Sequence, residues 1–199
     1  DPAKGEGVAA SWAAQKRLDG NVFAIDQILI DPDNPKKIHA VGQMGIWRTL
    51  DGGAAWGPGV IGLGVAVHKS MAAEPDKPRY VYVGDTDNGL WVSHDHAESV
   101  AYCTRPRSGA KPTIVDIDVD ATTGFVYAAI DDIWCYDPVK RSWSKVIGVN
   151  GKALKEVSGG QTPHGVEVER VSGSLVILAA VERSGFWRLP EGGAWEKVS

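Results

Sequence analysis

The sequence repeats itself with a period of about 44 residues. A glycine or aspartate, an apolar residue and a tryptophan recur as Gly45-Ile46-Trp47, Gly89-Leu90-Trp91, Asp132-Ile133-Trp134 and Gly185-Phe186-Trp187. These tryptophans are 44, 43 and 53 residues apart. A second aromatic residue follows each of them, at Trp56, Tyr102, Trp143 and Trp195. A fixed period of this size is typical of chains built from repeated structural units, so it constrains the fold more than any other feature.

Each repeat contains four short runs of strand-forming residues, separated by glycine, aspartate, asparagine or proline. In the first repeat the runs are 22–30, 37–41, 45–49 and 54–56, and in the third they are 113–119, 124–130, 133–136 and 142–146. Four antiparallel strands in about 44 residues is the size of one β-propeller blade. We therefore expect an all-β chain, a single propeller domain over 1–199, with blades at about 21–57, 65–104, 112–147 and 164–199.

Residues 1–20 form an incomplete extra unit, which we expect to be an N-terminal edge strand. Ser11-Trp12 resembles Ser142-Trp143 in the last strand of the third repeat. The segment could add an edge strand to the fourth blade of a compact four-bladed ring. It could also be the last strand of a blade in a larger ring, completed by another chain or by an oligomer. The fourth repeat has its own last strand at 193–198, so both interpretations remain open at this point, and we favour the second.

Composition excludes some function classes. The formal net charge is −4 and the basic residues do not cluster, so nucleic acid is a poor candidate partner. No apolar run approaches the length of about 20 residues that a membrane-spanning helix requires. Cys103 and Cys135 are too few for a disulfide scaffold, and we expect free thiols rather than a bridge, with their redox state left open.

One segment between the third and fourth runs resembles a known repeat. Thr49-Leu50-Asp51-Gly52-Gly53-Ala54-Ala55-Trp56 is similar to the Asp-box, or BNR repeat, with the pattern Ser/Thr-x-Asp-x-Gly-x-Thr-Trp. Residues 30–42 and 82–95 resemble stretches of sialidase-like, sortilin-like and xyloglucanase-like propellers. The later copies are degenerate, at Ser93/Asp95, Tyr136/Asp137 and Leu189/Glu191. The resemblance implies a structural role, away from the ligand-binding face, for Thr49, Asp51, Gly53 and Trp56.

Two other motifs are weighed and set aside. Residues 57–62 read G-x-G-x-x-G, but a dinucleotide site needs this motif between a strand and a helix, whereas here a strand follows. His94-Asp95-His96, near Asp85 and Asp87, offers metal-ligating groups. On a strand His94 and His96 would share one face while Asp95 points to the other, and no spacing fixes a third ligand, so a solvated turn is favoured. We expect neither a metal nor a cofactor.

In a propeller, ligands meet the loops between second and third strands and the connections between blades. The first set of loops holds polar residues of mixed charge: Gln43, Asp85, Asp87, Asn88, Asp131, Asp132, Glu182 and Arg183. The connections contain 58–63, 105–111 and the long stretch 152–164. Such a face suits a saccharide or a protein surface. We predict ligand binding there, and a protein located outside the cell or on the surface of a cell or virion.

Catalysis requires more than this face clearly supplies. The Arg-Ile-Pro signature of sialidases is absent. A xyloglucanase-like inverting hydrolase needs two carboxylates about 6.5–9.5 Å apart. The resemblance implies an acid near Gln43, and an amide cannot act as a general base. A pair would have to come from Asp85, Asp87, Asp131 and Asp132. We therefore expect a non-catalytic recognition or scaffold propeller that binds a glycan or a protein, with a xyloglucanase-like glycoside hydrolase, or a fragment of one, as the alternative.

Overall fold

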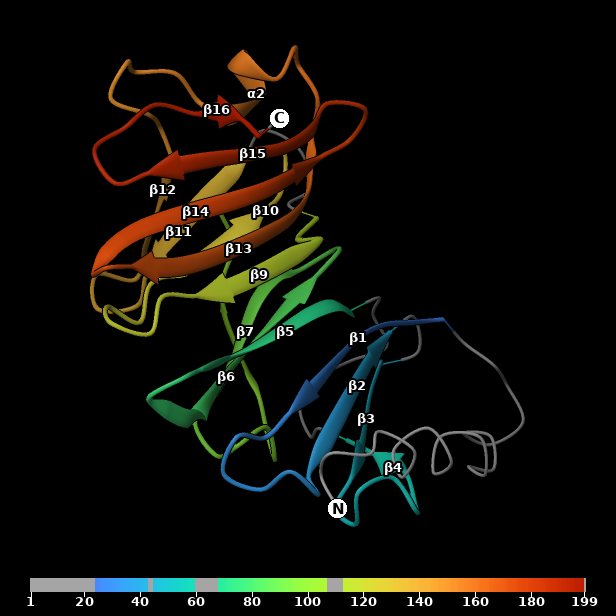
Figure 1. Ribbon diagram of the computed structural model, residues 1–199. Coiled ribbons are helices and arrows are strands. Elements are labelled where there is room, and N and C mark those ends of the chain that lie inside the picture. Colours follow the sequence, from blue (N-terminus) through green and yellow to red (C-terminus); the bar gives the residue numbers. More distant parts are fainter. Residues whose placement is uncertain (1–23, 43–44, 60–67, 107–112, 199) are drawn as a thin grey trace, which may run out of the picture.

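The computed structural model describes residues 24–42, 45–59, 68–106 and 113–198 (Figure 1). In these residues the chain forms four antiparallel sheets, each made of four consecutive strands in sequence order. The expectation of an all-β chain with four four-stranded units is confirmed. Residues 1–20, with Trp12, and Gln43 lie outside the described residues, so the expectations about them stay predictions.

The strand boundaries follow the repeats. The first sheet contains β1 (Ile25–Ile30), β2 (Ile38–Gly42), β3 (Gly45–Thr49) and β4 (Gly57–Pro58), and the second contains β5 (His68–Glu74), β6 (Lys77–Asp85), β7 (Gly89–Ser93) and β8 (Ala101–Thr104). The third contains β9 (Asp116–Val119), β10 (Val126–Ala129), β11 (Ile133–Asp137) and β12 (Ser142–Lys145). The fourth contains β13 (Pro163–Val171), β14 (Ser174–Val181), β15 (Gly185–Pro190) and β16 (Glu196–Lys197).

Two details differ from the sequence expectations. The fourth strand of the first sheet was expected at 54–56 but is Gly57–Pro58, because the residues before it form a turn ordered by the side chains of Thr49 and Asp51. The long connection between the third and fourth sheets contains a single helical turn, α2 (Leu154–Val157), whose Leu154 is fully buried. Within the described residues, no helix is long and apolar enough to cross a membrane.

The tryptophan of each repeat occupies the same place in its sheet. Trp47, Trp91, Trp134 and Trp187 lie in the third strands and are paired across the sheet with Ala40, Val83, Ala128 and Ala179. Those residues are in turn paired with first-strand residues Ile28, Met71, Ile117 and Val166. The repeat in the sequence therefore defines structurally equivalent positions in all four sheets.

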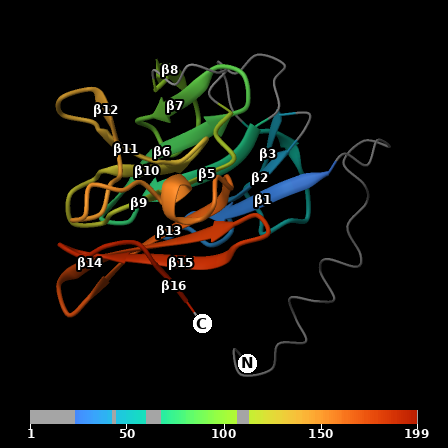
Figure 2. The same ribbon diagram turned by 90° about the horizontal axis from the view of Figure 1, so that it is seen from above.

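The hydrophobic core lies between consecutive sheets. One cluster joins the first and second sheets through Val41, Ile46, Met71 and Val83, and a second joins the second and third through Leu90, Ile117 and Tyr136. A third joins the third and fourth sheets through Ile133, Val166, Ile177 and Trp195. Trp91, Trp134 and Trp187 of the repeated series pack against these clusters. Figures 1 and 2 show the sheets following one another in chain order, with their first strands, β1, β5, β9 and β13, adjacent in turn.

Candidate functional site

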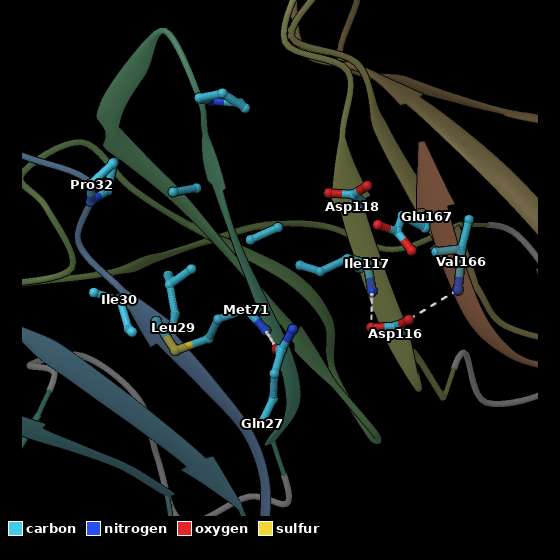
Figure 3. A pocket seen from close by; sticks show the side chains of 13 residues that line it. Gln27, Leu29, Ile30, Pro32, Met71, Asp116, Ile117, Asp118, Val166 and Glu167 are labelled. Atoms are coloured by element: carbon cyan, nitrogen blue, oxygen red, sulfur yellow. Dashed lines mark hydrogen bonds between the residues drawn. The ribbon is translucent and has the colours of Figure 1, made fainter. Parts of the chain in front are cut away.

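The first strands of all four sheets line one groove, which we call the inner groove (Figure 3). Its volume is about 520 Å³. The lining residues are Gln27, Leu29, Ile30, Pro32, Met71, Ala72, Ala73, Pro75, Asp116, Ile117, Asp118, Val166 and Glu167. Sequence reasoning had assigned the ligand site to loops and missed this groove. The signal that could have found it is the alternation of aspartates at 116, 118 and 120, along β9 and just after it.

The two sides of the inner groove differ in chemistry. The side formed by β1, β5 and the turns that follow them is mainly apolar, with Leu29, Ile30 and Met71 among its residues. The opposite side carries three carboxylates: Asp116 and Asp118 on β9, and Glu167 on β13 (Figure 3). A ligand that fills the groove therefore meets hydrocarbon on one side and negative charge on the other.

Two of these carboxylates also hold the neighbouring strand in place. The backbone N–H of Val166 donates to Asp116 Oδ2 at 2.9 Å, and that of Val168 donates to Asp118 Oδ2 at 2.7 Å. A first strand is the edge of its sheet, so its outward N–H groups need a partner outside the sheet. Each aspartate bonds the residue 50 positions later in the sequence, which sets the alignment of β13 beside β9.

Burial controls the charge on this wall. Removal from water raises the pKa of Asp116 to about 6, although backbone N–H groups of Val166 and Ile117 favour its ionised form. Burial also raises the pKa of Asp118, and the nearby Glu167 adds repulsion between like charges. Two carboxylates of the wall, Asp116 and Asp118, are therefore harder to ionise than a solvated aspartate. A cation placed in the groove would stabilise their charged forms.

Two of the loop aspartates expected on the binding face are buried. Asp85 is inaccessible to solvent; it accepts hydrogen bonds from the backbone N–H groups of Asp87, at 2.6 Å, and Asn88, at 2.9 Å, and its Oδ2 lies 3.3 Å from His68 Nδ1. Asp132 is 1% exposed and accepts from the N–H groups of Ile133 and Lys155. These placements differ from the surface positions that we expected, because a short loop after a strand leaves N–H groups that a buried aspartate can satisfy.

The remaining loop residues stay near the surface. Asp131 accepts a hydrogen bond from the indole N–H of Trp134 at 2.8 Å, and the amide of Asn88 donates to Asp85. Glu182 is exposed and lies 3.5 Å from His164, while the side chain of Arg183 is 83% exposed. None of these residues lines the inner groove. The groove and the loop set are therefore distinct surfaces.

The turn between β3 and β4 is ordered by the Thr49 and Asp51 side chains. Thr49 Oγ1 donates to Asp51 Oδ1 at 2.7 Å and accepts from the N–H of Gly53 at 2.9 Å, and Asp51 also accepts from Ala55. Gly53 has a φ of +102°, which favours glycine. By connectivity this turn lies at the opposite end of the strands from the loops that hold Asp85 and Asp132.

The second sheet repeats this network despite its degenerate sequence. Ser93 Oγ donates to Asp95 Oδ1 at 2.7 Å and accepts from the N–H of Ala97 at 2.9 Å, and Asp95 accepts from Ser99. These bonds lower the pKa of Asp95 to about 2 against the opposing effect of burial. The carboxylate of Asp95 is therefore used in ordering the turn. The side chains of its neighbours His94 and His96 take no part in these hydrogen bonds.

One group of side chains has the composition of a cation site. Ligand atoms of Asp31, Asp33 and His96 all lie within 4.8 Å of one another. The ammonium group of Lys37 is 4.0 Å from Asp31 Oδ2 and donates to the carbonyl of His96 at 2.6 Å. A positive charge thus already lies beside the carboxylate of Asp31, and a metal ion would have to compete with it.

The two cysteines are free thiols, and Cys103 donates to the hydroxyl of Tyr136 at 3.1 Å.

Comparison with known proteins identifies the fold through similar solved structures. No protein-family model matches the sequence, and no curated protein does either. Among solved structures, the xyloglucanase of family GH74 from Xanthomonas campestris matches 92% of this chain and 31% of its own, with a TM-score of 0.62 and 18% identity. A structure described as YCF48 bound to D1 peptide matches 92% of this chain and 56% of its own, with a TM-score of 0.57 and 13% identity.

The four sheets are blades of a β-propeller. The WD40 repeats of RRP9 also match, over 81% of this chain and 50% of theirs, with a TM-score of 0.54 and 14% identity. The neighbours thus include glycoside hydrolases and proteins of other kinds, so the shared feature is the propeller scaffold. The chain spans between 25% and 31% of the length of the GH74 enzymes that it matches.

Proposed function

We propose that this protein is a non-catalytic recognition propeller whose inner groove binds an extended polypeptide segment with both apolar and basic side chains. The observation that carries the proposal is the two-sided lining of the groove, with apolar side chains from the first and second blades facing Asp116, Asp118 and Glu167. Successive side chains of an extended strand point in opposite directions. Alternating apolar and basic residues would therefore meet both sides at once.

The lining argues for a polypeptide over a saccharide in this groove. Sugar rings bind proteins largely through aromatic faces and polar groups, and none of the described residues that line the groove is aromatic. The width of four adjacent first strands suits a linear ligand. One structural neighbour, YCF48, has been solved with a bound peptide, which supports this class of ligand for a propeller of similar fold.

Binding to a short labelled peptide tests the proposal. The probes are two amidated hexapeptides of alternating residues, one of lysine and valine and one of glutamate and valine, followed by fluorescence anisotropy at low salt. We expect the basic peptide to bind and the acidic one not to. The variants Asp118→Asn and Glu167→Gln should each weaken binding of the basic peptide about 5- to 10-fold, since each removes a charge from the groove.

Glu169→Gln is the matched control. Glu169 is an exposed carboxylate on β13, two residues from Glu167, but it does not line the groove. Its removal changes the net charge of the protein equally and should leave the affinity within about twofold. Equal affinity for the two peptides, or equal effects of Glu167→Gln and Glu169→Gln, would refute the groove as the site.

A glycoside hydrolase is the second candidate. The observation in its favour is a carboxyl group, Asp116, with a pKa of about 6 in a groove that also holds Glu167, as a general acid and a second carboxylate would be. However, both oxygens of Asp116 accept backbone N–H groups, which leaves the carboxyl poorly placed to move a proton. We expect no release of reducing sugar from xyloglucan or β-glucan oligosaccharides. Release that Asp116→Asn abolishes would establish the enzyme.

A further inference from the structure

A second cavity, of about 290 Å³, lies between the second and third blades, and we call it the tyrosine pocket. Its residues come from β6, β7, β8, β11 and the turns after β7 and β11. They are Tyr80, Tyr82, Val92, His94, Cys103, Tyr136, Pro138 and Arg141. It shares no residue with the inner groove and none with the loop set. The volume is at the lower end of the range of about 300–1,000 Å³ typical of small-molecule sites, which is suited to a ligand of about one ring.

The walls of the tyrosine pocket are aromatic and already packed. The rings of Tyr80 and His94 meet edge to face with their centroids 5.0 Å apart, and the ring of Tyr136 packs against Trp143 at 5.2 Å. Tyr82 is 3% exposed and Tyr136 is 2% exposed. Because neighbours fix these rings, a ligand would enter a cavity that needs little rearrangement, so binding would cost little conformational entropy.

Three of the polar groups of the tyrosine pocket are tyrosine hydroxyls, beside the side chains of His94, Cys103 and Arg141. The hydroxyl of Tyr136 accepts a hydrogen bond from Cys103, and that of Tyr80 accepts one from Arg79 at 3.3 Å. No hydrogen bond of the Tyr82 hydroxyl is found among the described residues, so this hydroxyl can donate to a ligand. Aromatic faces beside hydroxyl groups recognise a ligand that has both C–H surfaces and hydroxyls of its own.

The charge at the tyrosine pocket is positive. The exposed guanidinium of Arg141 lines it, and no lining residue is a carboxylate. The guanidinium carbon of Arg79 lies over the ring of Tyr80, 5.0 Å from the ring centroid. The Arg141 guanidinium acts on the buried groups: it opposes the rise in the pKa of Cys103 and of Tyr136 that burial causes. The carboxylate of Glu74, which acts on Tyr82, is neutralised by Lys77 at 2.8 Å. In a protein of net charge −4, this local excess of positive charge favours an anionic ligand.

We propose that the tyrosine pocket binds an acidic monosaccharide unit, a uronic acid, with the sugar ring against the tyrosine rings and its carboxylate on Arg141. Arg141 can hold a carboxylate through two parallel N–H donors. The Tyr82 hydroxyl donates to a ring hydroxyl of the sugar. This site is independent of the inner groove, so peptide binding there neither supports nor excludes it.

Isothermal titration calorimetry with methyl β-D-glucuronide and methyl β-D-glucoside tests the proposal, since the two probes differ only in the carboxylate. We expect the glucuronide to bind at least about 10-fold more tightly than the glucoside. Arg141→Gln should remove this preference. Lys140→Gln is the matched control: it removes the same charge from the neighbouring residue of the same turn, whose ammonium pairs with Asp137 at 3.1 Å outside the pocket, and it should keep the preference.

Two further readouts make the result decisive. Unfolding midpoints of both variants should equal that of the wild type, because both side chains are exposed, so lost binding would not reflect lost folding. Tyr80→Leu should weaken both probes together, since it removes a ring and leaves the charge. Equal affinity for the two probes, no binding of either, or equal loss in Arg141→Gln and Lys140→Gln would overturn the proposal.

Discussion

Two interfaces between blades supply acceptors for the backbone N–H groups of a neighbouring first strand, but they use different side chains. One lies between the third and fourth blades and the other between the first and second. At the first of these, Asp116 and Asp118 accept N–H groups of β13, and Asp120 pairs with Arg170 through two hydrogen bonds, at 2.9 and 2.7 Å. At the second, the equivalent of Asp116 is Gln27, whose amide oxygen accepts the N–H of Met71 (Figure 3).

The difference teaches where charge is needed. A neutral amide is sufficient to satisfy an edge N–H, so the carboxylates of β9 are more than the interface requires. Between the first and second blades the charged contacts include the partly exposed pair of Asp26 and Lys69 and the bonds of Lys37 and Arg48 to Glu98. The carboxylates of this strand thus exceed what the fold requires, as the proposed binding of a basic ligand would explain.

The largest expected effect is the loss of the ion pair between the third and fourth blades, which joins the exposed Arg170 to the buried Asp120. Arg170→Met should lower the free energy of unfolding more than Lys69→Met does, because it leaves the 2% exposed carboxylate of Asp120 without a counter-ion. Arg170 also holds the pKa of Asp120 at about 2, so the pair is intact at neutral pH. Urea unfolding at pH 7 measures the change. A loss under 1 kcal/mol would show that the interface does not depend on the pair.

The acidic strand should also make stability fall as the pH rises. The folded-state pKa of Asp116, about 6, lies above its ordinary value of 3.8, so the folded form binds a proton more tightly than the unfolded chain does. Between pH 4 and pH 7 this costs up to about 3 kcal/mol. Asp116→Asn should remove that part of the pH dependence. Parallel pH profiles of unfolding for the wild type and the variant would contradict the account.

The interface between the first and second blades should respond to pH in the opposite direction. His39 is 2% exposed, and burial lowers its pKa from 6.5 to about 4. The unfolded chain therefore binds the proton first, and up to about 3 kcal/mol of stability is lost as the pH falls from 6.5 to 4. His39→Leu should flatten this limb of the profile. Thermal unfolding between pH 4 and 7 tests it, and an unchanged acid limb would rule out His39 as its cause.

The smallest expected effect is at the ion pair between β1 and β5. Asp26 and Lys69 are 2.7 Å apart but 24% and 29% exposed. Lys69→Met should cost less than about 1 kcal/mol, because water solvates both charges when the pair breaks. In both pairs the charged atoms are 2.7 Å apart, but the carboxylate of Asp120 is more deeply buried than that of Asp26. Comparing Lys69→Met with Arg170→Met under the same conditions therefore shows whether burial or distance determines what a pair contributes to stability. Equal losses in the two variants would remove the distinction between the two interfaces.

Much of the fold could be predicted from the sequence, because it depends on patterns of residues that are close together in the chain. The tryptophan period gave four sheets, and the pairing of Trp47, Trp91, Trp134 and Trp187 with small residues follows that period. The hydrogen bonds of Thr49 and Asp51 also depend on residues close in sequence. The expected strand at 54–56 was misplaced, since that turn extends further than strand propensity indicates.

The candidate site could not be predicted in the same way. In the sequence Asp85 and Asp132 stand in polar stretches that look like exposed loops, although Asp85 is the last residue of β6. Only the packing of His68 and Lys145 beside these aspartates shows that they are buried. The inner groove combines residues from four blades, up to 140 positions apart between Gln27 and Glu167. No local pattern encodes such a distance. The bonds from Asp116 to Val166 and from Asp118 to Val168 likewise appear only when the blades are placed side by side.

The most direct test of the central claim is a map of backbone amide shifts in two-dimensional ¹⁵N–¹H NMR spectra, recorded as the basic hexapeptide is added. The account predicts that the largest shifts occur in the inner groove, at Met71 to Ala73, Asp116 to Asp118, and Val166 and Glu167. Shifts that instead gather at Asp87, Asn88, Glu182 and Arg183, with the groove unchanged, would place the ligand on the loop face and contradict it.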